Sequence, residues 1–426
     1  MRWIRRVKLD KQYITNISIL SGGTLVSQVV PLIATPFLTR IYDPEQFGQF
    51  ALFASTCAII GSINTGRLEA ALFIERSTAG ENTVIMTSLF ITIVVTTISA
   101  VFLLASKAWF GCFRDLSYAE TVVGLALLSL FVLSFGIYKI LYNLSIKLRD
   151  FGSVAKIRAV KGVSTSSSTL GIGLWAPSSG LILGYLIGEL YMSAAMIVKH
   201  QLRLNELRRE LAIRRIRKGI RRHRGFLTLS TPADGISSLA NNIPTILIGS
   251  FFGATVVGWY GFTHRLLTAP ISMIASSVVD AFKTEASEQY ATTGEFTKLF
   301  KRTSGLLISL SIIPCIVAFL FADELFAIVF GQKWRVAGEY ASILSLLYFI
   351  RFVVSPLTYT VNIIERQDVT LVWSVAVLAV SVTSFAFGGV AGSVKVGLWS
   401  FSVGYSLLYA SYFFYLYHLS KGTRTR

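Results

Sequence analysis

Long uncharged stretches are the feature that most restricts the fold of this 426-residue chain. A helix that crosses the roughly 30 Å hydrocarbon core of a bilayer needs about 20 apolar residues. Two apolar stretches are each interrupted by a single arginine, Arg265 or Arg351. Further stretches of about the required length or more contain no Asp, Glu, Lys or Arg: residues 12–39, 46–66, 82–106, 121–138, 162–188, 235–264, 303–322, 369–394 and 396–420. The pattern predicts an all-α integral membrane protein.

Two of these stretches are too long for one crossing. The cluster around Pro177 divides residues 162–188, and Gly253 is a natural break in residues 235–264. Dividing the chain there predicts about twelve transmembrane helices. The predicted domains are an N-terminal six-helix lobe at 1–200, a basic cytoplasmic linker or surface helix at 201–224, and a C-terminal six-helix lobe at 225–426.

The distribution of charge predicts how the chain lies in the membrane. Only 15% of the residues are charged, which excludes an ordinary soluble enzyme, yet the net charge is +18. Most of the surplus lies in residues 1–11, 201–224 and 421–426. Short cytoplasmic segments are enriched in Lys and Arg. With a cytoplasmic N-terminus, these three segments and residues 139–161 and 283–302 all lie inside. We therefore expect a multi-pass protein of the cytoplasmic (inner) membrane with both termini in the cytoplasm.

The two halves of the chain resemble each other weakly. Pro31 precedes Gly48 by seventeen positions, and Pro244 precedes Gly261 by the same distance. Such matches occur in the same order in both halves and are separated by a nearly constant number of residues. They indicate two six-helix repeats of parallel topology. Transporters built of repeats place their substrate site at the interface between the lobes.

Catalytic and cofactor motifs are missing from the sequence. There is no GxxxxGK[ST] loop, no HExxH, no GxSxG and no CxxC pair, and the four histidines are scattered. We therefore predict no enzyme activity, no catalytic residues, no metal and no cofactor.

Charged residues inside the predicted helices are the candidate functional groups, because a charge at a helix centre normally faces a cavity or a partner. Arg265 and Arg351 lie deep in the predicted eighth and tenth helices, and Arg67 lies near the inner end of the second. These arginines are candidate ligands of an anionic headgroup, since guanidinium binds phosphate oxygens through two parallel donors. The alternative is internal ion pairing with Glu189 or Asp234, which are themselves candidates for ion coupling or ion pairing.

The basic segment 201–224 has three interpretations. Its Leu and Ile residues recur mostly at three- and four-residue steps with arginines between them, which favours an amphipathic helix on an anionic lipid surface. A solvated linker is the simpler alternative. A nucleic-acid site is not expected between two membrane-embedded halves without interleaved aromatic residues.

Three short segments carry a resemblance to a known family. They are PFLTRIYDPEQFG at residues 36–48, VGWYGFTHRL at 257–266 and FGQKWRVA at 330–337. In combination they resemble the Wzx-type polysaccharide and O-antigen repeat-unit flippases of the multidrug/oligosaccharidyl-lipid/polysaccharide exporter superfamily. The resemblance extends over residues 12 to 420. The chain departs from the family pattern at Asn241 and Asn242, where the seventh helix often carries an Asp.

The resemblance implies two six-helix lobes around a central cavity that opens alternately to either side. The implied substrate is an undecaprenyl-diphosphate-linked oligosaccharide for O-antigen, lipopolysaccharide, capsule or exopolysaccharide synthesis, flipped from the inner to the outer leaflet. The positions that fit contact with the diphosphate are Arg265 and Arg351. Other polysaccharide-assembly proteins are possible partners. The alternatives are a small-molecule or drug antiporter of the same superfamily, a membrane-embedded glycan-assembly enzyme, and a nonenzymatic assembly scaffold.

Overall fold

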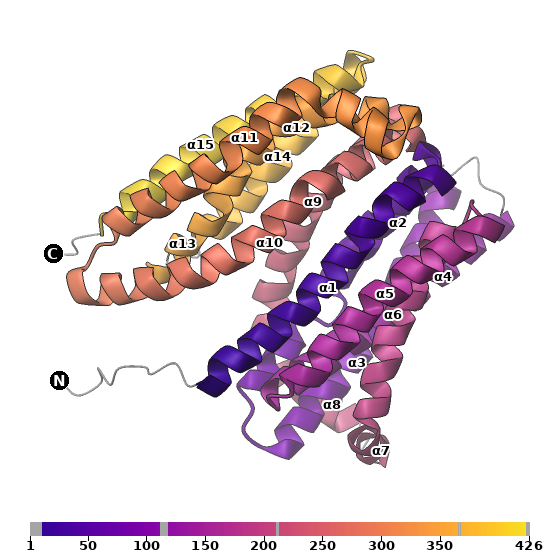
Figure 1. The fold of residues 1–426 in the computed structure, drawn as a ribbon. Coiled ribbons are helices and arrows are strands. Elements are labelled where there is room, and N and C mark those ends of the chain that lie inside the picture. Colours follow the sequence, from indigo (N-terminus) through magenta and orange to yellow (C-terminus); the bar gives the residue numbers. More distant parts are fainter. Residues whose placement is uncertain (1–10, 111–117, 210–212, 365, 367, 423–426) are drawn as a thin grey trace. The chain divides into compact units, whose positions relative to one another are not determined.

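The computed structural model describes residues 11–110, 118–209, 213–364, 366 and 368–422. Within these ranges every regular element is a helix, which confirms the all-α class (Figure 1). The helices of 20 residues or more are α1 Lys11–Ile41, α2 Pro44–Ile63, α3 Thr78–Phe110, α4 Tyr118–Lys147, α5 Phe151–Trp175, α6 Gly180–Lys199, α9 Thr231–Phe252, α10 Ala254–Thr293, α11 Thr297–Phe330, α12 Arg335–Val354, α14 Asp368–Val390 and α15 Val394–Ser420. The shorter ones are η1 Leu68–Phe73, α7 Gln201–Arg209, α8 Ile213–Arg222, η2 Phe226–Ser230, η3 Gln332–Trp334, η4 Ser355–Tyr359 and α13 Thr360–Ile363.

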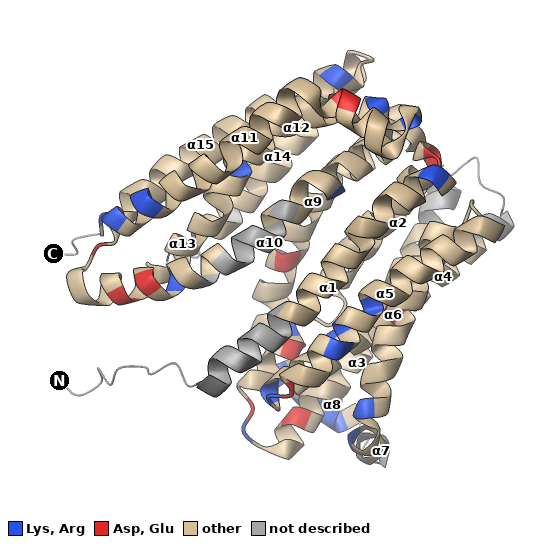
Figure 2. Cartoon of the chain, in the orientation of Figure 1, with Lys and Arg blue, Asp and Glu red and all other residues tan. Residues whose placement is uncertain are grey.

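Eight stretches of the described helices are long and apolar enough to cross a bilayer. In α11, the charged residues lie near the two ends and leave residues 303–322 uncharged (Figure 2). Large side chains such as Ile313, Phe319 and Leu320 are exposed along that uncharged part, as expected for a helix that faces lipid. The multi-pass membrane protein is thus confirmed, and the number of crossings stays a prediction.

The chain divides into two compact units. Unit 1 consists of Met1–Ala34 and Thr56–Gly235, and unit 2 consists of Thr35–Ser55 and Ile236–Arg426. Helices α1, α2 and α9 each contribute residues to both units. In unit 1, α5 packs on α6, α4 on α6, and α3 on α4 and α8. In unit 2, α12 packs on α10, α11 and α15, and α14 on α15.

Small residues bring α5 and α6 of unit 1 close together. The Cα atoms of Gly184 and Gly188 lie against Thr169 and Thr165, and a Cβ at either glycine would overlap these threonines. Such spacing lets two membrane helices approach through van der Waals contact of their backbones. The close α5–α6 contact fixes which polar residues of the two helices face each other.

Aromatic residues hold unit 2 together. The Trp334 ring is fully buried and lies 4.9 Å from the Phe47 ring and 4.3 Å from the Phe262 ring, centroid to centroid. The Trp334 indole N–H donates to the carbonyl oxygen of Thr39 at 3.1 Å. The first part of α2 is thereby attached to α10 and η3, and a buried indole obtains the acceptor that it needs.

Several predicted boundaries need correction. Most of residues 139–161, expected as a cytoplasmic segment between two helices, is helical, because α4 continues to Lys147 and α5 already begins at Phe151. Within the described residues, the linker at 201–224 is helical as expected, in α7 and α8 on either side of residues 210–212. The basic segment 1–10, residues 210–212 of the linker and residues 423–426 of the C-terminal patch lie outside the described residues.

Candidate functional site

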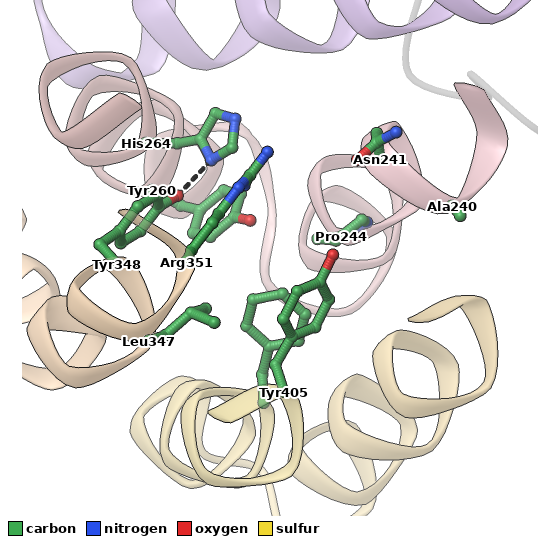
Figure 3. A pocket seen from close by; sticks show the side chains of 10 residues that line it. Ala240, Asn241, Pro244, Tyr260, His264, Leu347, Tyr348, Arg351 and Tyr405 are labelled. Atoms are coloured by element: carbon green, nitrogen blue, oxygen red, sulfur yellow. Dashed lines mark hydrogen bonds between the residues drawn. The ribbon is translucent and has the colours of Figure 1, made fainter. Parts of the chain in front are cut away.

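A small polar pocket in unit 2 surrounds Arg351. It is lined by residues of α9, α10, α12 and α15 (Figure 3): Ala240, Asn241, Pro244, Tyr260, His264, Leu347, Tyr348, Arg351, Phe401 and Tyr405. Its cavity volume of about 20 Å³ is enough for about one water molecule. None of these lining residues is Asp or Glu, so Arg351 is the one full charge in the described lining of the pocket.

Helical periodicity explains why these side chains meet. Tyr348 and Arg351 are three residues apart on α12, and Tyr260 and His264 are four residues apart on α10, so each pair shares one helix face. The Tyr348 hydroxyl and the His264 Nδ1 form a hydrogen bond (Figure 3). The Tyr260 and His264 rings stack with centroids 6.0 Å apart. The imidazole is thereby held in one orientation at the edge of the pocket.

Within the described part of the chain, no carboxylate accompanies Arg351, in contrast to Arg67, Lys139 and Lys161, which are described below. Among the described residues, its guanidinium has no ion-pair partner within 4.0 Å, and the groups that interact with it electrostatically include the hydroxyls of Tyr260, Tyr348, Tyr405 and Tyr409. A positive charge in an apolar lobe is costly unless an anion or a dipole compensates it. A guanidinium with neighbouring hydroxyl donors is suited to binding a multivalent anion such as phosphate.

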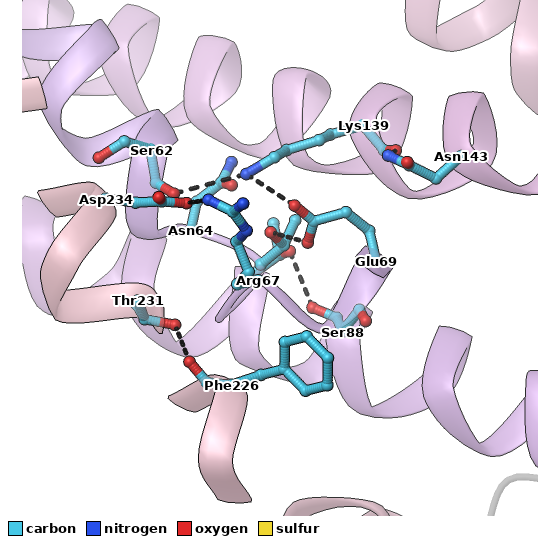
Figure 4. Close-up of polar contacts among 12 residues, drawn as sticks. Ser62, Asn64, Arg67, Glu69, Ser88, Lys139, Asn143, Phe226, Thr231 and Asp234 are labelled. Carbon is cyan, nitrogen blue, oxygen red and sulfur yellow. Dashed lines mark hydrogen bonds and ion pairs between the residues drawn. The ribbon is translucent and has the colours of Figure 1, made fainter. Parts of the chain in front are cut away.

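A second polar cluster lies in unit 1, where α2 ends. Arg67 follows the left-handed Gly66 and is itself left-handed, with φ 56°, and its guanidinium pairs with the Asp234 carboxylate at the start of α9 (Figure 4). The buried Glu69 carboxylate accepts from Lys139 at 3.0 Å and from the Thr65 hydroxyl at 2.5 Å. All four charges of this cluster therefore have partners of opposite sign.

A third group of charges lies where α5 meets α6 in unit 1. The Lys161 ammonium donates to Glu189 Oε2 at 2.6 Å. One turn earlier, Arg158 donates to the Tyr138 hydroxyl and to Thr24 Oγ1, each at 3.1 Å, and lies over the Tyr142 ring. These partners of Arg158 are all uncharged. The same face of α5 thus carries two cations and meets one carboxylate.

The predicted site residues therefore fall into separate groups. Arg351 lines the pocket of unit 2, whereas Arg265 is a half-buried residue of α10 that is not part of the pocket lining. In unit 1, Arg67 pairs with Asp234 and Glu189 pairs with Lys161. The two carboxylates considered as partners for Arg265 or Arg351 are thus neutralised by other residues.

The sequence analysis missed Arg158 and Lys161, because it assigned residues 139–161 to a cytoplasmic segment. A signal was present: Asp150 is a typical N-cap residue, and its side chain accepts from the Ser153 backbone N–H at 3.2 Å. Val154 and Ile157, three residues apart, are both buried. Capping and periodicity together would have started the helix three turns before residue 162.

The sequence of this chain matches a known family over most of its length. Residues 37–339 match the sequence model described as "Polysaccharide biosynthesis protein". Over 390 residues, the chain is 21% identical to the succinoglycan biosynthesis transport protein ExoT of Rhizobium meliloti, covering 86% of this chain and 72% of that protein. It is 26% identical to the teichuronic acid biosynthesis protein TuaB of Bacillus subtilis over 170 residues, 39% of this chain, and this match spans only 35% of the Bacillus protein.

Solved structures share the fold at low sequence identity. The inward closed conformation of the lipid II flippase MurJ aligns with a TM-score of 0.70 and 11% identity, covering 93% of this chain and 87% of that one. An inward-facing multidrug resistance transporter of the MATE family and the MOP superfamily aligns with a TM-score of 0.56 and 15% identity, covering 95% and 97%. At such identities the likeness shows the fold alone, and that fold has the predicted two lobes.

The matching family and the solved structures with the same fold point to the same kind of protein. The named relatives and neighbours include transporters and a flippase, which agrees with the prediction that the chain is not an enzyme. The chain is a multi-pass membrane protein with the fold of the MOP-superfamily transporters, and it belongs to the polysaccharide biosynthesis protein family.

Proposed function

We propose that this protein is a flippase for undecaprenyl-diphosphate-linked oligosaccharide repeat units. It moves them from the inner to the outer leaflet of the bacterial cytoplasmic membrane by alternating access, for O-antigen, capsule or exopolysaccharide synthesis. Family membership supports a role in polysaccharide biosynthesis. The names of the relatives, a succinoglycan transport protein and a lipid II flippase, support a lipid-linked glycan as the substrate.

The observation that carries this proposal is Arg351 in its tyrosine-lined pocket. A diphosphate carries several negative charges, and a guanidinium that has no carboxylate partner can donate two parallel hydrogen bonds to it. The cavity of about 20 Å³ is too small for a diphosphate. Binding therefore requires the pocket to widen, which is a change that alternating access supplies.

Two more arginines complete the proposed contacts. Arg265 follows His264 on α10, and it supplies a second cation to the headgroup. Arg67, in unit 1, becomes available to a phosphate only when its pair with Asp234 opens. Both termini and the linker at 201–224 lie on the cytoplasmic side in this proposal, where the linker meets anionic lipid.

A drug antiporter of the same superfamily is the weaker alternative. Cationic drugs require carboxylates in the binding pocket, and the lining of the Arg351 pocket contains none. The charge of the pocket favours an anionic substrate.

The test is a leaflet assay in proteoliposomes with a fluorescent undecaprenyl-diphosphate-linked glycan. We expect the wild type to translocate the glycan and Arg351→Ala to translocate it at least tenfold more slowly. Arg351→Lys should keep partial activity, because its ammonium retains the charge but not the paired N–H donors of the guanidinium. Arg335→Ala is the matched control, because Arg335 begins the same helix but is exposed, with Asp323 3.5 Å away. Wild-type rates equal to those of empty vesicles would reject the flippase, and equal rates in wild type and Arg351→Ala would reject the role of Arg351.

A further inference from the structure

Two lysine side chains converge on one aromatic ring at the end of unit 2 where α11 begins and α15 ends. The Lys301 ammonium lies 5.5 Å from the centroid of the Tyr417 ring, and the Lys421 ammonium lies 4.9 Å from the same centroid. The π electrons of the ring attract each cation, but the two like charges repel each other. An anion that contacts both ammonium groups would remove this repulsion.

The Tyr417 ring is held in place by the packing of α15 on α11. It lies 5.9 Å from the fully buried Phe300 ring, centroid to centroid. The Ser420 carbonyl oxygen accepts from the Phe296 backbone N–H at 3.0 Å and from the Thr297 hydroxyl at 3.1 Å. These contacts attach the last turn of α15 to the first turn of α11, so the ring and its two cations stand on a fixed base.

Within the described part of the chain, no carboxylate neutralises these two lysines: no Asp or Glu oxygen lies within 4.0 Å of the Lys301 or Lys421 ammonium. Glu295, in the turn between α10 and α11, is the acidic residue nearest to Lys301 along the chain, but it is exposed and lies beyond this distance. By contrast, Lys395 at the other end of α15 pairs with Glu339 at 2.8 Å. The charge at the Tyr417 end of unit 2 is therefore available to an anionic ligand.

An exposed apolar surface begins directly beside Lys301. One face of α11 continues from this lysine at steps of three and four residues through Gly305, Ile308, Ile312 and Ile316, which are all exposed. A Cβ at Gly305 would meet no atom within 4 Å, so the helix surface is open one turn after the lysine. A molecule with an anionic head and a hydrocarbon chain can therefore contact the two lysines and this face together.

We propose that Lys301, Lys421 and Tyr417 form a binding site for one molecule of an anionic glycerophospholipid. Its phosphate lies between the two ammonium groups, and one acyl chain follows the exposed face of α11 from Gly305. Charge-assisted hydrogen bonds from ammonium to phosphate are among the stronger ones, and tyrosine is enriched at the level of the lipid headgroups. Basic pockets between membrane helices bind lipid headgroups in the same way.

The chemistry of the site selects among the anions that could reach it. Free phosphate would leave the apolar face of α11 unused. A zwitterionic lipid would bring its own cation next to Lys301 and Lys421, so it would not relieve their repulsion. The ligand is therefore a lipid with a net negative charge, such as phosphatidylglycerol. This site is independent of the proposed flippase activity and lies in unit 2, away from the basic linker of unit 1.

The first measurement is native mass spectrometry of the full-length protein titrated with phosphatidylglycerol or phosphatidylcholine. The wild type should retain one phosphatidylglycerol with higher affinity than phosphatidylcholine. The double variant Lys301→Gln/Lys421→Gln should bind the anionic lipid about tenfold more weakly, and both positions are exposed, so the variant should fold. Equal affinities of wild type and double variant, or no preference of the wild type for the anionic lipid, would overturn the proposal.

Lys395→Gln is the matched control for this titration. Lys395 begins the region of α15 at the opposite end of the same helix, and its charge already has a carboxylate partner. We expect this variant to bind phosphatidylglycerol as the wild type does. The exposed cations of the linker are the same in all these proteins, so their contribution to lipid binding cancels in the comparison. A loss in Lys395→Gln as large as in the double variant would mean that net charge alone governs binding, which would refute a specific site.

The aromatic ring has its own test. Tyr417→Phe keeps the ring that both cations contact and should bind like the wild type. Tyr417→Leu removes the ring, so the two lysines lose their common support and the affinity should decrease by about threefold. An affinity of Tyr417→Leu equal to that of the wild type would show that the lysines act as separate surface charges, and it would overturn the site.

The last measurement locates the lipid and identifies its source. A phosphatidylglycerol with a photoreactive group in one acyl chain should label residues 305–316 of α11 more strongly than the same probe with a phosphocholine headgroup. Unlabelled phosphatidylglycerol should suppress this labelling, whereas inorganic phosphate should not. Equal labelling by the two probes, or equal suppression by inorganic phosphate, would contradict a lipid site at Lys301 and Lys421.

Discussion

The Arg67 guanidinium pairs with the Asp234 carboxylate and so joins the turn after α2 to the first turn of α9 within unit 1 (Figure 4). The two residues are 167 positions apart in the sequence. Residues of α9 up to Gly235 belong to unit 1, and those from Ile236 on belong to unit 2. The pair therefore fixes the unit 1 end of a helix that both units share.

Breaking this pair should lower stability modestly. The side chains of Arg67 and Asp234 are 43% and 29% exposed, so we expect Asp234→Asn to cost less than about 1 kcal/mol. Arg67→Asn removes the charge while keeping a residue that tolerates a left-handed backbone. Thermal unfolding of both single variants and the double variant measures the coupling between them. Strictly additive effects would show that the pair contributes nothing.

Gly48 should be far more sensitive to a methyl group than most helical glycines. Within unit 2, a Cβ at Gly48 of α2 would overlap the carbonyl oxygen of Ala254 in α10. We expect Gly48→Ala to lose about 1–3 kcal/mol through overpacking. A Cβ at Gly305 of α11 would meet no atom within 4 Å, so Gly305→Ala should be neutral or stabilising by up to about 1 kcal/mol. Equal melting temperatures of the two variants would contradict the close α2–α10 contact.

The helical class could be predicted from the sequence because the bilayer imposes a simple rule. Segments such as residues 303–322 contain no charge and are long enough to cross, and α11 indeed spans them. The same rule finds only the part of α5 that follows residue 161, because the first turns of this helix carry Lys156, Arg158 and Lys161. A search for uncharged stretches cannot find the charged turns of a helix.

The residues of the candidate sites were only partly predictable. A lone charge such as Arg351 or Glu189 stands out in an apolar stretch, so both were identified. Their partners were not, because the contact of Glu189 with Lys161 depends on how α5 packs on α6, and the tyrosines around Arg351 come from α10, α12 and α15. Which side chains of different helices meet depends on the tertiary structure, and the periodicity of one helical segment does not predict it.

The exposed face of α8 should bind anionic lipid. Gly219 packs against Thr87 of α3, and Arg222 and His223 contact the Glu75 carboxylate at 2.9 and 3.1 Å. The remaining cations of α8 that are exposed are Arg214, Arg217, Lys218 and Arg221. Near an anionic surface, each Lys or Arg contributes about 1 kcal/mol.

The wild type should melt at a higher temperature in phosphatidylglycerol nanodiscs than in phosphatidylcholine nanodiscs. Replacing these four exposed cations with Gln should make this difference in melting temperature smaller. Arg222→Gln is the control, because its charge already has a carboxylate partner within the protein. An undiminished lipid effect in the fourfold variant would favour the solvated linker instead.

His200, directly after α6, should make the protein less stable in mild acid. Burial and the positive charges of Lys199 and Arg203 hold the pKa of His200 below its ordinary value of 6.5, and its Nε2 lies 2.8 Å from the Ser145 hydroxyl. As the pH falls below 6.5, the unfolded chain takes up a proton that the folded one does not, so stability decreases until the pH passes the folded pKa. His200→Gln, which cannot titrate, should show a smaller decrease in melting temperature between pH 7.5 and 5.5. His418→Gln, at an exposed position, should behave like the wild type, and an unchanged decrease in His200→Gln would mean that other groups cause the acid sensitivity.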